Sequence, residues 1–266
     1  LDARQRLAAV CEEQGETERA LAAYRKLAAK SSEMGDRSRA LAATERLRAL
    51  DPDNLDCCSD LAETYLKLDR VDEAIAQFHF LGERLLAKGQ RDEGIRVNRQ
   101  ISLLAPDRLD CRLQVADRYE RHGLNEQAVT EYLEIANAAT AGANAEVLRV
   151  VGERGLALAP DHLLFLQSRY LALRLTGDRE AMAALGRPLI ERYEREELFS
   201  KAEETIADLL ALDPQDLELR LRLVALYEKQ KRFDELQPVL DALADLLVER
   251  DRFAEAADLY RFRLHL

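Results

Sequence analysis

Tryptophan is absent from the sequence, and glycine and proline are scarce, with 11 and 6 residues among 266. So little glycine and proline excludes a collagen-like or low-complexity chain. The β-branched residues that favour strands are also few, which argues against a sheet. Alanine, leucine, arginine and glutamate dominate instead, and all four favour helices by intrinsic propensity. The composition therefore predicts an all-α protein.

Two further absences narrow the classes of function. No run of about 20 apolar residues occurs, so we expect no membrane insertion. The net charge of −11 argues against nucleic acid as the main ligand, because phosphate binding needs a clustered excess of lysine and arginine. The sequence has 32 arginines and only 7 lysines, a bias typical of GC-rich bacterial genomes.

A proline-centred turn recurs along the chain. Residues 48–56 read RALDPDNLD, 102–110 read SLLAPDRLD, 156–164 read LALAPDHLL and 210–218 read LALDPQDLE. The four prolines are spaced by 54 residues, and units 1–52, 53–106, 107–160, 161–214 and 215–266 align without a gap. We therefore expect a single repeat array over 1–266, and because it begins with Leu1 rather than Met, a piece of a longer protein.

Each unit is predicted to contain three helices, A, B and C. Helix A, for example 55–68, has an apolar stripe with helical spacing. It ends at a turn suited to a left-handed residue, at Gly15, Asp69, Gly123, Gly177 or Lys231. Helix B spans about 18 residues and carries an acidic residue in its first turn, where the helix dipole favours negative charge; these residues are Glu18, Asp72, Glu126, Glu180 and Asp234. A second turn, at Gly35, Gly89 or around Gly142, leads to helix C, which ends at the proline.

These positions resemble the tetratricopeptide repeat (TPR) family. The second unit has the small and aromatic residues of that family's helix-turn-helix signature, namely Leu61, Ala62, Tyr65, Ala74, Phe78 and Leu81. The resemblance implies an all-α, TPR-like, right-handed α-solenoid of about 15 helices, and a protein or peptide as partner. A family repeat has 34 residues, whereas here spacings of 34 and 20 alternate. With three antiparallel helices per unit, the chain direction reverses at each unit, so equivalent residues should point to alternating sides.

Nothing in the sequence favours an enzyme. His79, His122, His162 and His265 occupy different repeat positions, so we expect them to share no site. Glycine-rich phosphate loops, zinc-ligand pairs and nucleophile elbows do not occur. We predict no catalytic residue, no cofactor and no metal site.

The four cysteines, Cys11, Cys57, Cys58 and Cys111, lack metal-ligand spacing and indicate a reduced, cytoplasmic setting. Cys57 and Cys111 share a repeat position, which suggests a small packing residue rather than a redox role. Neighbouring helix residues point about 100° apart, so only one of Cys57 and Cys58 is expected to face the core.

The resemblance implies that helix A presents the partner-binding face. Its candidate positions in the second unit are Asp56, Ser59, Glu63, Leu66 and Lys67. In the fourth unit, the helix at 161–176 is apolar nearly all round, which indicates either extra burial or a docking surface. Pro188 should kink or split the helix B that follows, and we expect a crevice beside 161–176.

From these features we predict a protein-interaction scaffold that binds a partner through helix A of the third and fourth units. The predicted partner-binding residues are Asp117, Glu120, Arg121, Leu164, Leu171, Arg174 and Leu175. The alternative is an architectural or self-associating spacer. Its interface would be the stripe at 252–266, with Phe253, Leu259, Tyr260, Phe262 and Leu264, covered by a following unit or by a second copy.

Overall fold

The computed structural model describes residues 1–264, and over that range it contains 15 α-helices and no strand. The helices are α1 (Asp2–Glu13), α2 (Thr17–Glu33), α3 (Arg37–Leu50), α4 (Leu55–Lys67), α5 (Val71–Ala87), α6 (Arg91–Leu104), α7 (Leu109–Arg121), α8 (Asn125–Ala141), α9 (Ala145–Leu158), α10 (Leu163–Thr176), α11 (Arg179–Arg195), α12 (Phe199–Leu212), α13 (Leu217–Lys229), α14 (Phe233–Glu249) and α15 (Phe253–Leu264). The all-α, solenoid-type fold predicted from the repeat is confirmed.

The 54-residue period fixes where the helices begin. All five B helices, α2, α5, α8, α11 and α14, have 17 residues and start 54 residues apart. Four of the C helices, α3, α6, α9 and α12, have 14 residues with the same spacing. The helix boundaries therefore follow the 54-residue period of the sequence.

Each unit has two residues with a left-handed backbone conformation, one after helix A and one after helix B. The turn after helix A has φ between 58° and 76° at the five predicted positions, which include Asp69 and Lys231. The turn after helix B has positive φ at Gly35, Gly89, Ala143, Glu197 and Asp251. In the third unit the sequence suggested Gly142, but Ala143 takes this conformation with φ 49°. The fixed helix lengths decide which residue turns, and the glycine lies one position too early.

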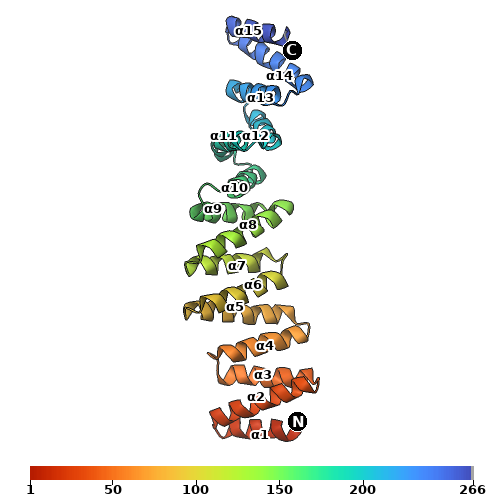
Figure 1. The fold of residues 1–266 in the computed structure, drawn as a ribbon, viewed down its shortest axis with the longest axis vertical. Helices are drawn as coiled ribbons and strands as arrows, with labels where there is room; N and C mark the ends of the chain where they lie inside the picture. The colour runs from red at the N-terminus through yellow and green to blue at the C-terminus, as the bar shows by residue number, and fades with distance from the viewer. Residues whose placement is uncertain (265–266) are drawn as a thin grey trace. The chain divides into compact units, whose positions relative to one another are not determined.

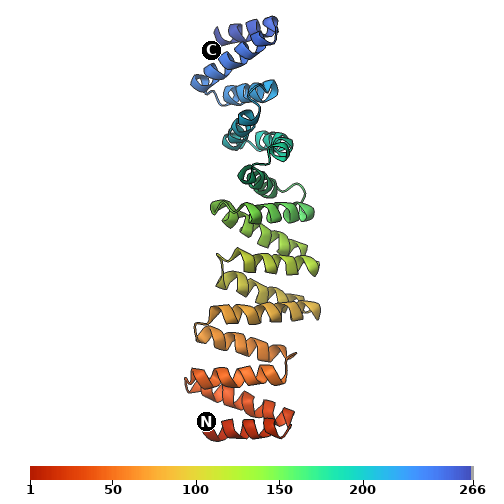
Figure 2. The same cartoon turned by 180° about the vertical axis from the view of Figure 1, so that it is seen from behind.

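The chain divides into two compact units, Leu1–Ile135 and Ala136–Leu266, which we call the N-unit and the C-unit and describe separately. In the N-unit, each helix from α1 to α7 packs against the next, as the red to yellow-green ribbons show (Figure 1). In the C-unit, the helices from α9 to α15 pack in the same consecutive way, and Figure 2 shows them from behind.

A helix between two neighbours buries two faces, and this corrects the expectation for the adjacent cysteines. Cys57 and Cys58 on α4 are 1% and 0% exposed, so both face the interior. α4 packs against α3 on one side and α5 on the other. An angle of about 100° between neighbouring side chains is compatible with burial of both. All four cysteines are buried and free.

Pro188 does not split its helix, although a split was one of the two outcomes expected from the sequence, a kink being the other. α11 runs without interruption from Arg179 to Arg195 with Pro188 inside it, and α14 likewise contains Pro238. Both prolines are exposed, as are Ala184 and Asp234, four residues before them. Water can therefore solvate the carbonyl groups that each proline leaves without a helical partner.

The acidic residue predicted near the start of helix B lies in the first turn of all five B helices.

Within residues 1–264, no helix has the length and hydropathy needed to cross a membrane.

The C-terminal stripe is only partly exposed. Phe253 and Tyr260 on α15 are exposed, whereas Leu259 and Phe262 pack against the core of the C-unit. The side chain of Leu264 and all of residues 265–266 lie outside the described part of the chain, and with them His265.

Candidate partner-binding grooves

A groove of about 920 Å³ lies in the N-unit between α4 and α6, with α5 beneath it. We call it the α4–α6 groove. Buried Phe78, Leu81 and Leu85 of α5 form its floor. Leu66 of α4 and Val97 of α6 extend this apolar strip up the two walls. The groove thus combines an apolar base with open sides, as sites for side chains of a ligand require.

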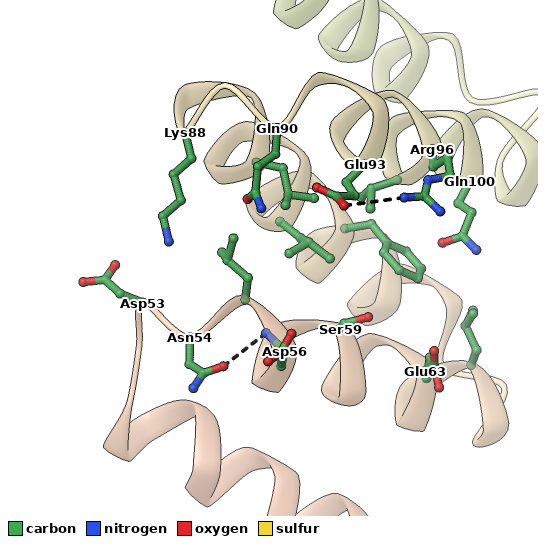
Figure 3. A pocket seen from close by; sticks show the side chains of 16 residues that line it. Asp53, Asn54, Asp56, Ser59, Glu63, Lys88, Gln90, Glu93, Arg96 and Gln100 are labelled. Carbon is green, nitrogen blue, oxygen red and sulfur yellow. Dashed lines mark hydrogen bonds and ion pairs between the residues drawn. The ribbon is translucent and has the colours of Figure 1, made fainter.

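Polar side chains line the rims of this groove, as Figure 3 shows. Asp56, Ser59 and Glu63 lie along α4, on the wall opposite Glu93, Arg96 and Gln100 of α6. Local structure fixes the start of α4, because the side chain of Asn54 accepts hydrogen bonds from the backbone N–H groups of Asp56 and Cys57.

Only some of the charges in the groove are neutralised within the protein. Arg96 pairs with Glu93 at 3.7 Å, and Asp53 pairs with Arg84 at 3.2 Å. Within residues 1–264, no ion pair of Asp56 or Glu63 is observed, although both side chains are exposed. The α4 wall therefore presents carboxylates to solvent.

A second groove, which we call the α2–α4 groove, lies on the same face. Its lining includes Arg25 and Ser32 of α2, Thr44 of α3, and Asp60 and Glu63 of α4, and its volume is about 200 Å³. Glu63 lines both grooves, so the two adjoin at α4. Partial burial, then the neighbouring charges of Glu63 and Asp56, raise the pKa of Asp60.

The opposite face of the N-unit is formed by the odd-numbered helices. A groove of about 510 Å³ lies between α1 and α3 and is lined by Gln5 and Ala9 of α1. Gln5 and Ala9 occupy the repeat positions of Ser59 and Glu63, which line the α4–α6 groove. The expectation that equivalent residues of successive units point to alternating sides is thus confirmed within the N-unit.

In the C-unit, a groove of about 330 Å³ lies beside α10, where the sequence predicted a crevice. Leu164, Leu171 and Arg174 line it. Arg174 pairs with Glu204 at 2.6 Å and with Asp208 at 3.0 Å, both on α12. Its charge is therefore already neutralised across this groove, which we call the α10 groove.

The apolar surface of α10 is mostly used for packing. Phe165, Tyr170 and Ala172 are buried, and Leu163, Leu166 and Leu173 pack against the core of the C-unit. Gly155 of α9 allows close approach, because a Cβ atom there would overlap the ring of Phe165. Leu175 remains exposed, so a narrow strip with Leu164 and Leu171 is left for docking.

The three charged candidates on α7 belong to the N-unit and contact its other side chains. Arg121 pairs with Asp117 at 3.0 Å and with Glu83 of α5 at 3.2 Å. Glu120 accepts a hydrogen bond of 3.0 Å from the hydroxyl of Tyr132. Asp117, Glu120 and Arg121 lie in the N-unit, and Leu164, Leu171, Arg174 and Leu175 lie in the C-unit. That these residues bind a partner stays a prediction.

His79 and His122 take part in one hydrogen-bond network around Arg118 and Glu83. The expectation that the histidines share no site is therefore wrong for these two. Arg118 Nη2 lies 3.0 Å from Nδ1 of His79, and its Nε donates to Glu83 at 3.0 Å. Glu83 also lies 3.2 Å from Nε2 of His122. Comparison of repeat positions did not predict this network, because it joins α7 of one unit to α5 of the preceding unit. Side chains at different repeat positions therefore come into contact. Burial, then the charge of Arg118, lowers the pKa of His79 to about 4.

The sequence identified the lining of the α4–α6 groove but did not rank it first. Asp56, Ser59, Glu63 and Leu66 were placed at ligand-facing positions and do line the groove, and Lys67 lines the adjoining α2–α4 groove. The sequence-based prediction placed the site in the third and fourth units because their sequences deviate from the repeat. Such deviation does not show which charged side chains form ion pairs. The grooves differ in this respect, since Arg174 of the α10 groove is paired, whereas Asp56 and Glu63 of the α4–α6 groove have no ion-pair partner among the described residues.

Residues 31–79 match the family model described as tetratricopeptide repeat. This segment of the chain therefore contains a tetratricopeptide repeat. The TPR match includes all of α4, which forms one wall of the α4–α6 groove. No curated protein matches the chain.

Several solved structures resemble parts of the chain. A structure of MamA is 15% identical, with 58% of this chain and 97% of that chain covered and a TM-score of 0.30. YrrB, described as a TPR protein with an unusual peptide-binding site, is 17% identical, with 65% and 93% covered and a TM-score of 0.30. The TPR2AB domain of yeast Sti1, in a complex with pHSP90, is 13% identical, with 92% and 97% covered and a TM-score of 0.34. At these TM-scores the likeness carries no argument about function.

Proposed function

We propose that this chain is a protein-interaction scaffold that binds a segment of a partner protein in the α4–α6 groove. TPR domains generally mediate protein–protein interactions, and this chain has a TPR match over one wall of the groove. The observation that carries the proposal is the combination of an apolar floor with carboxylates that have no partner within the described residues. Binding in a bacterial cytoplasm is part of the proposal, supported by the free, buried cysteines and the arginine-rich composition.

Size and chemistry support this site over the others. A groove of about 920 Å³ accommodates several ligand side chains. Apolar side chains of a partner would be desolvated on Phe78, Leu81 and Leu85, and the polar rim would fix their register. In the α10 groove, by contrast, Arg174 already bridges to two carboxylates, so a charged ligand would have to displace an existing pair.

The α10 groove is the second candidate surface. Its strip of Leu164, Leu171 and exposed Leu175 offers apolar contact area. This strip and Arg174 are the C-unit part of the partner-binding set predicted from the sequence, and the α7 residues Asp117, Glu120 and Arg121 are its N-unit part. We retain this set as a second proposal. Comparing Ser59→Tyr with the double variant Leu171→Ala and Leu175→Ala tests the α4–α6 groove and the α10 groove separately.

The test is a selection of random linear peptides on the 266-residue chain, followed by calorimetric measurement of Kd. Ser59→Tyr places a large side chain in the α4–α6 groove and should weaken binding at least 10-fold, because the ligand loses contact area and register. The variant Leu171→Ala with Leu175→Ala should leave Kd within about 2-fold. Circular dichroism checks that both variants keep their helices.

The outcomes separate the two grooves. If Leu171→Ala with Leu175→Ala abolishes binding and Ser59→Tyr does not, the α10 groove is the site and the α4–α6 assignment is wrong. If neither variant changes the Kd of any selected peptide, the chain does not bind through either groove.

A self-associating spacer is the second candidate function, and one observation favours it. Leu7 on α1 is exposed, although its equivalents Leu61 and Val115 are buried against a preceding helix C. Tyr260 on α15 is also exposed, although Asn98 and Ile206 at the same repeat position are buried. The exposed face of α15 therefore has the position that accepts a helix A, which either a following unit or α1 of a second copy could supply.

Light scattering over a range of concentrations tests this spacer hypothesis. Head-to-tail contact would give a mass that rises with concentration without reaching a fixed limit, because such an interface does not close. Tyr260→Glu should abolish that rise. A constant monomer mass would exclude self-association and leave the interaction scaffold.

A further inference from the structure

The carboxylates of α4 form a ridge along one side of the helix. Asp56, Asp60 and Glu63 are four and three residues apart, so their side chains follow each other on one face. All three are exposed, and among the described residues none takes part in an ion pair. We call these three residues the α4 carboxylate ridge.

This ridge differs from the carboxylates of the α6 wall and of the α10 groove. Glu93 pairs with Arg96 at 3.7 Å in the α4–α6 groove. Glu204 and Asp208 pair with Arg174 at 2.6 Å and 3.0 Å in the α10 groove. A carboxylate without a partner gains more from an added cation than one whose charge is already neutralised, because no existing pair has to be broken.

The ridge also has internal repulsion that a bound cation would relieve. The pKa of Asp60 is raised by partial desolvation and then by the charges of Glu63 and Asp56, while Arg25 and Lys67 lower it to a smaller extent. Like charges this close destabilise the ionised state of one another. A cationic group placed between them would therefore be attracted by more than one carboxylate.

The spacing of the ridge matches an extended peptide. From Asp56 to Glu63, seven residues of helix span about 10 Å at 1.5 Å per residue. In an extended strand, alternate residues project to the same side about 6.6 Å apart. Lysine or arginine side chains at alternate positions can therefore reach Asp56 and Glu63, which line the α4–α6 groove, and can extend across α4 to Asp60, which lines the α2–α4 groove. The residues between them would point to the other side, toward the apolar floor with Leu81.

We propose that the occupant of the α4–α6 groove is an extended, basic segment of a partner protein, in which lysine or arginine alternates with apolar residues. The basic side chains contact the α4 carboxylate ridge, and the apolar ones enter between α4 and α6 over Phe78 and Leu81. This inference rests on the proposed function and adds the charge and pattern of the ligand. Charge complementarity also steers such a segment toward a chain with a net charge of −11.

The test uses three fluorescein-labelled nonapeptides in which leucine alternates with lysine, glutamine or glutamate. Fluorescence anisotropy gives the Kd of each for the whole chain. The lysine peptide should bind at least 10-fold more tightly than the glutamine peptide, and the glutamate peptide should not bind measurably. The preference should decrease as salt is raised, since exposed charges are screened.

A matched pair of triple variants locates the effect. Asp56→Asn with Asp60→Asn and Glu63→Gln should weaken binding of the lysine peptide about 10-fold, as expected for three exposed ion pairs. Glu13→Gln with Glu18→Gln and Asp107→Asn changes the net charge by the same amount at exposed residues that line none of the grooves described above. This control should change the Kd less than 2-fold. Equal weakening by both variants would mean attraction by net charge alone and would overturn the proposal.

The remaining outcomes distinguish this inference from the proposed function. If the glutamine or glutamate peptide binds as tightly as the lysine peptide and Ser59→Tyr still abolishes binding, the groove binds peptides but the inferred charge is wrong. If Ser59→Tyr affects no peptide, the groove is not a binding site and both proposals fail.

Discussion

Gln5 and Ser59 occupy the same position in successive repeats, yet they line grooves on opposite faces of the N-unit. The cause is the odd number of helices in the repeat. Each helix packs antiparallel to the last, so three helices per unit place helix A on one face in one unit and on the other face in the next. A groove on one face therefore combines helix A with helix C of the same unit, as α4 and α6 do, or with helix B of the preceding unit, as α4 and α2 do.

The first prediction concerns the left-handed turn at Ala143. An alanine at φ 49° carries a steric cost that glycine does not. Ala143→Gly should therefore stabilise the chain by up to about 1 kcal/mol, seen as a higher midpoint of urea unfolding. Gly142→Ala is the control, because its φ is not positive and a Cβ there meets only the carbonyl of Ala138 at 3.6 Å. A lower midpoint for Ala143→Gly would contradict the assignment of the turn.

The second prediction concerns a buried ion pair between α7 and α8. Arg112 Nε lies 2.6 Å from Oε1 of Glu131, and their side chains are 10% and 12% exposed. Ser102 donates a further hydrogen bond to Glu131 at 3.0 Å. Glu131→Leu leaves the guanidinium buried without a partner and should lower the free energy of unfolding by about 3 kcal/mol.

Adding Arg112→Met to Glu131→Leu should recover most of that loss, because both buried charges are then replaced by apolar groups. Urea unfolding of the four proteins of this cycle gives the coupling directly. A loss below 1 kcal/mol in the single variant would show that the pair is open to solvent.

The third prediction is a pH dependence caused by His79. The folded-state pKa is lowered to about 4, so between pH 6.5 and pH 4 the unfolded chain binds more protons than the folded one at this site. Stability should therefore fall as the pH decreases through that window, by about 1 to 2 kcal/mol from this residue once solvent screening is allowed for. His79→Gln should remove this part of the slope in urea unfolding, whereas an unchanged slope would place the dependence on other groups.

The fourth prediction concerns thiol reactivity. Burial raises the pKa of the thiols of Cys57, Cys58 and Cys111, and the thiolate is the reactive form. Native protein should therefore react with iodoacetamide at none of its four cysteines within minutes, while urea-unfolded protein should take up four labels. Mass spectrometry counts the labels. Rapid labelling of Cys57 in the native chain would show that α4 separates from α3.

Sequence periodicity predicted most of the fold because each unit repeats the same pattern of helix-forming and turn-forming residues. The positions of the left-handed turns and the starts of the B helices follow from 54-residue spacing alone. Burial of both Cys57 and Cys58 did not follow, because it depends on how many neighbours a helix has. The contact between Arg118 and His79 was equally hidden, since it joins α5 and α7 of adjacent units at different repeat positions. Charge pairing in the grooves likewise depends on neighbouring helices.

The most direct test of the account is photo-crosslinking from one repeat position on two faces. A benzoylphenylalanine is placed at position 100 in one variant and at position 46 in another, and each is irradiated with a peptide selected on the unmodified chain. Gln100 is an exposed residue of the α4–α6 groove, and Arg46, one repeat earlier, is an exposed residue of the groove between α1 and α3. We predict a crosslink from position 100 and none from position 46. A crosslink from position 46 alone, or equal yields from both positions, would contradict the assignment of the site.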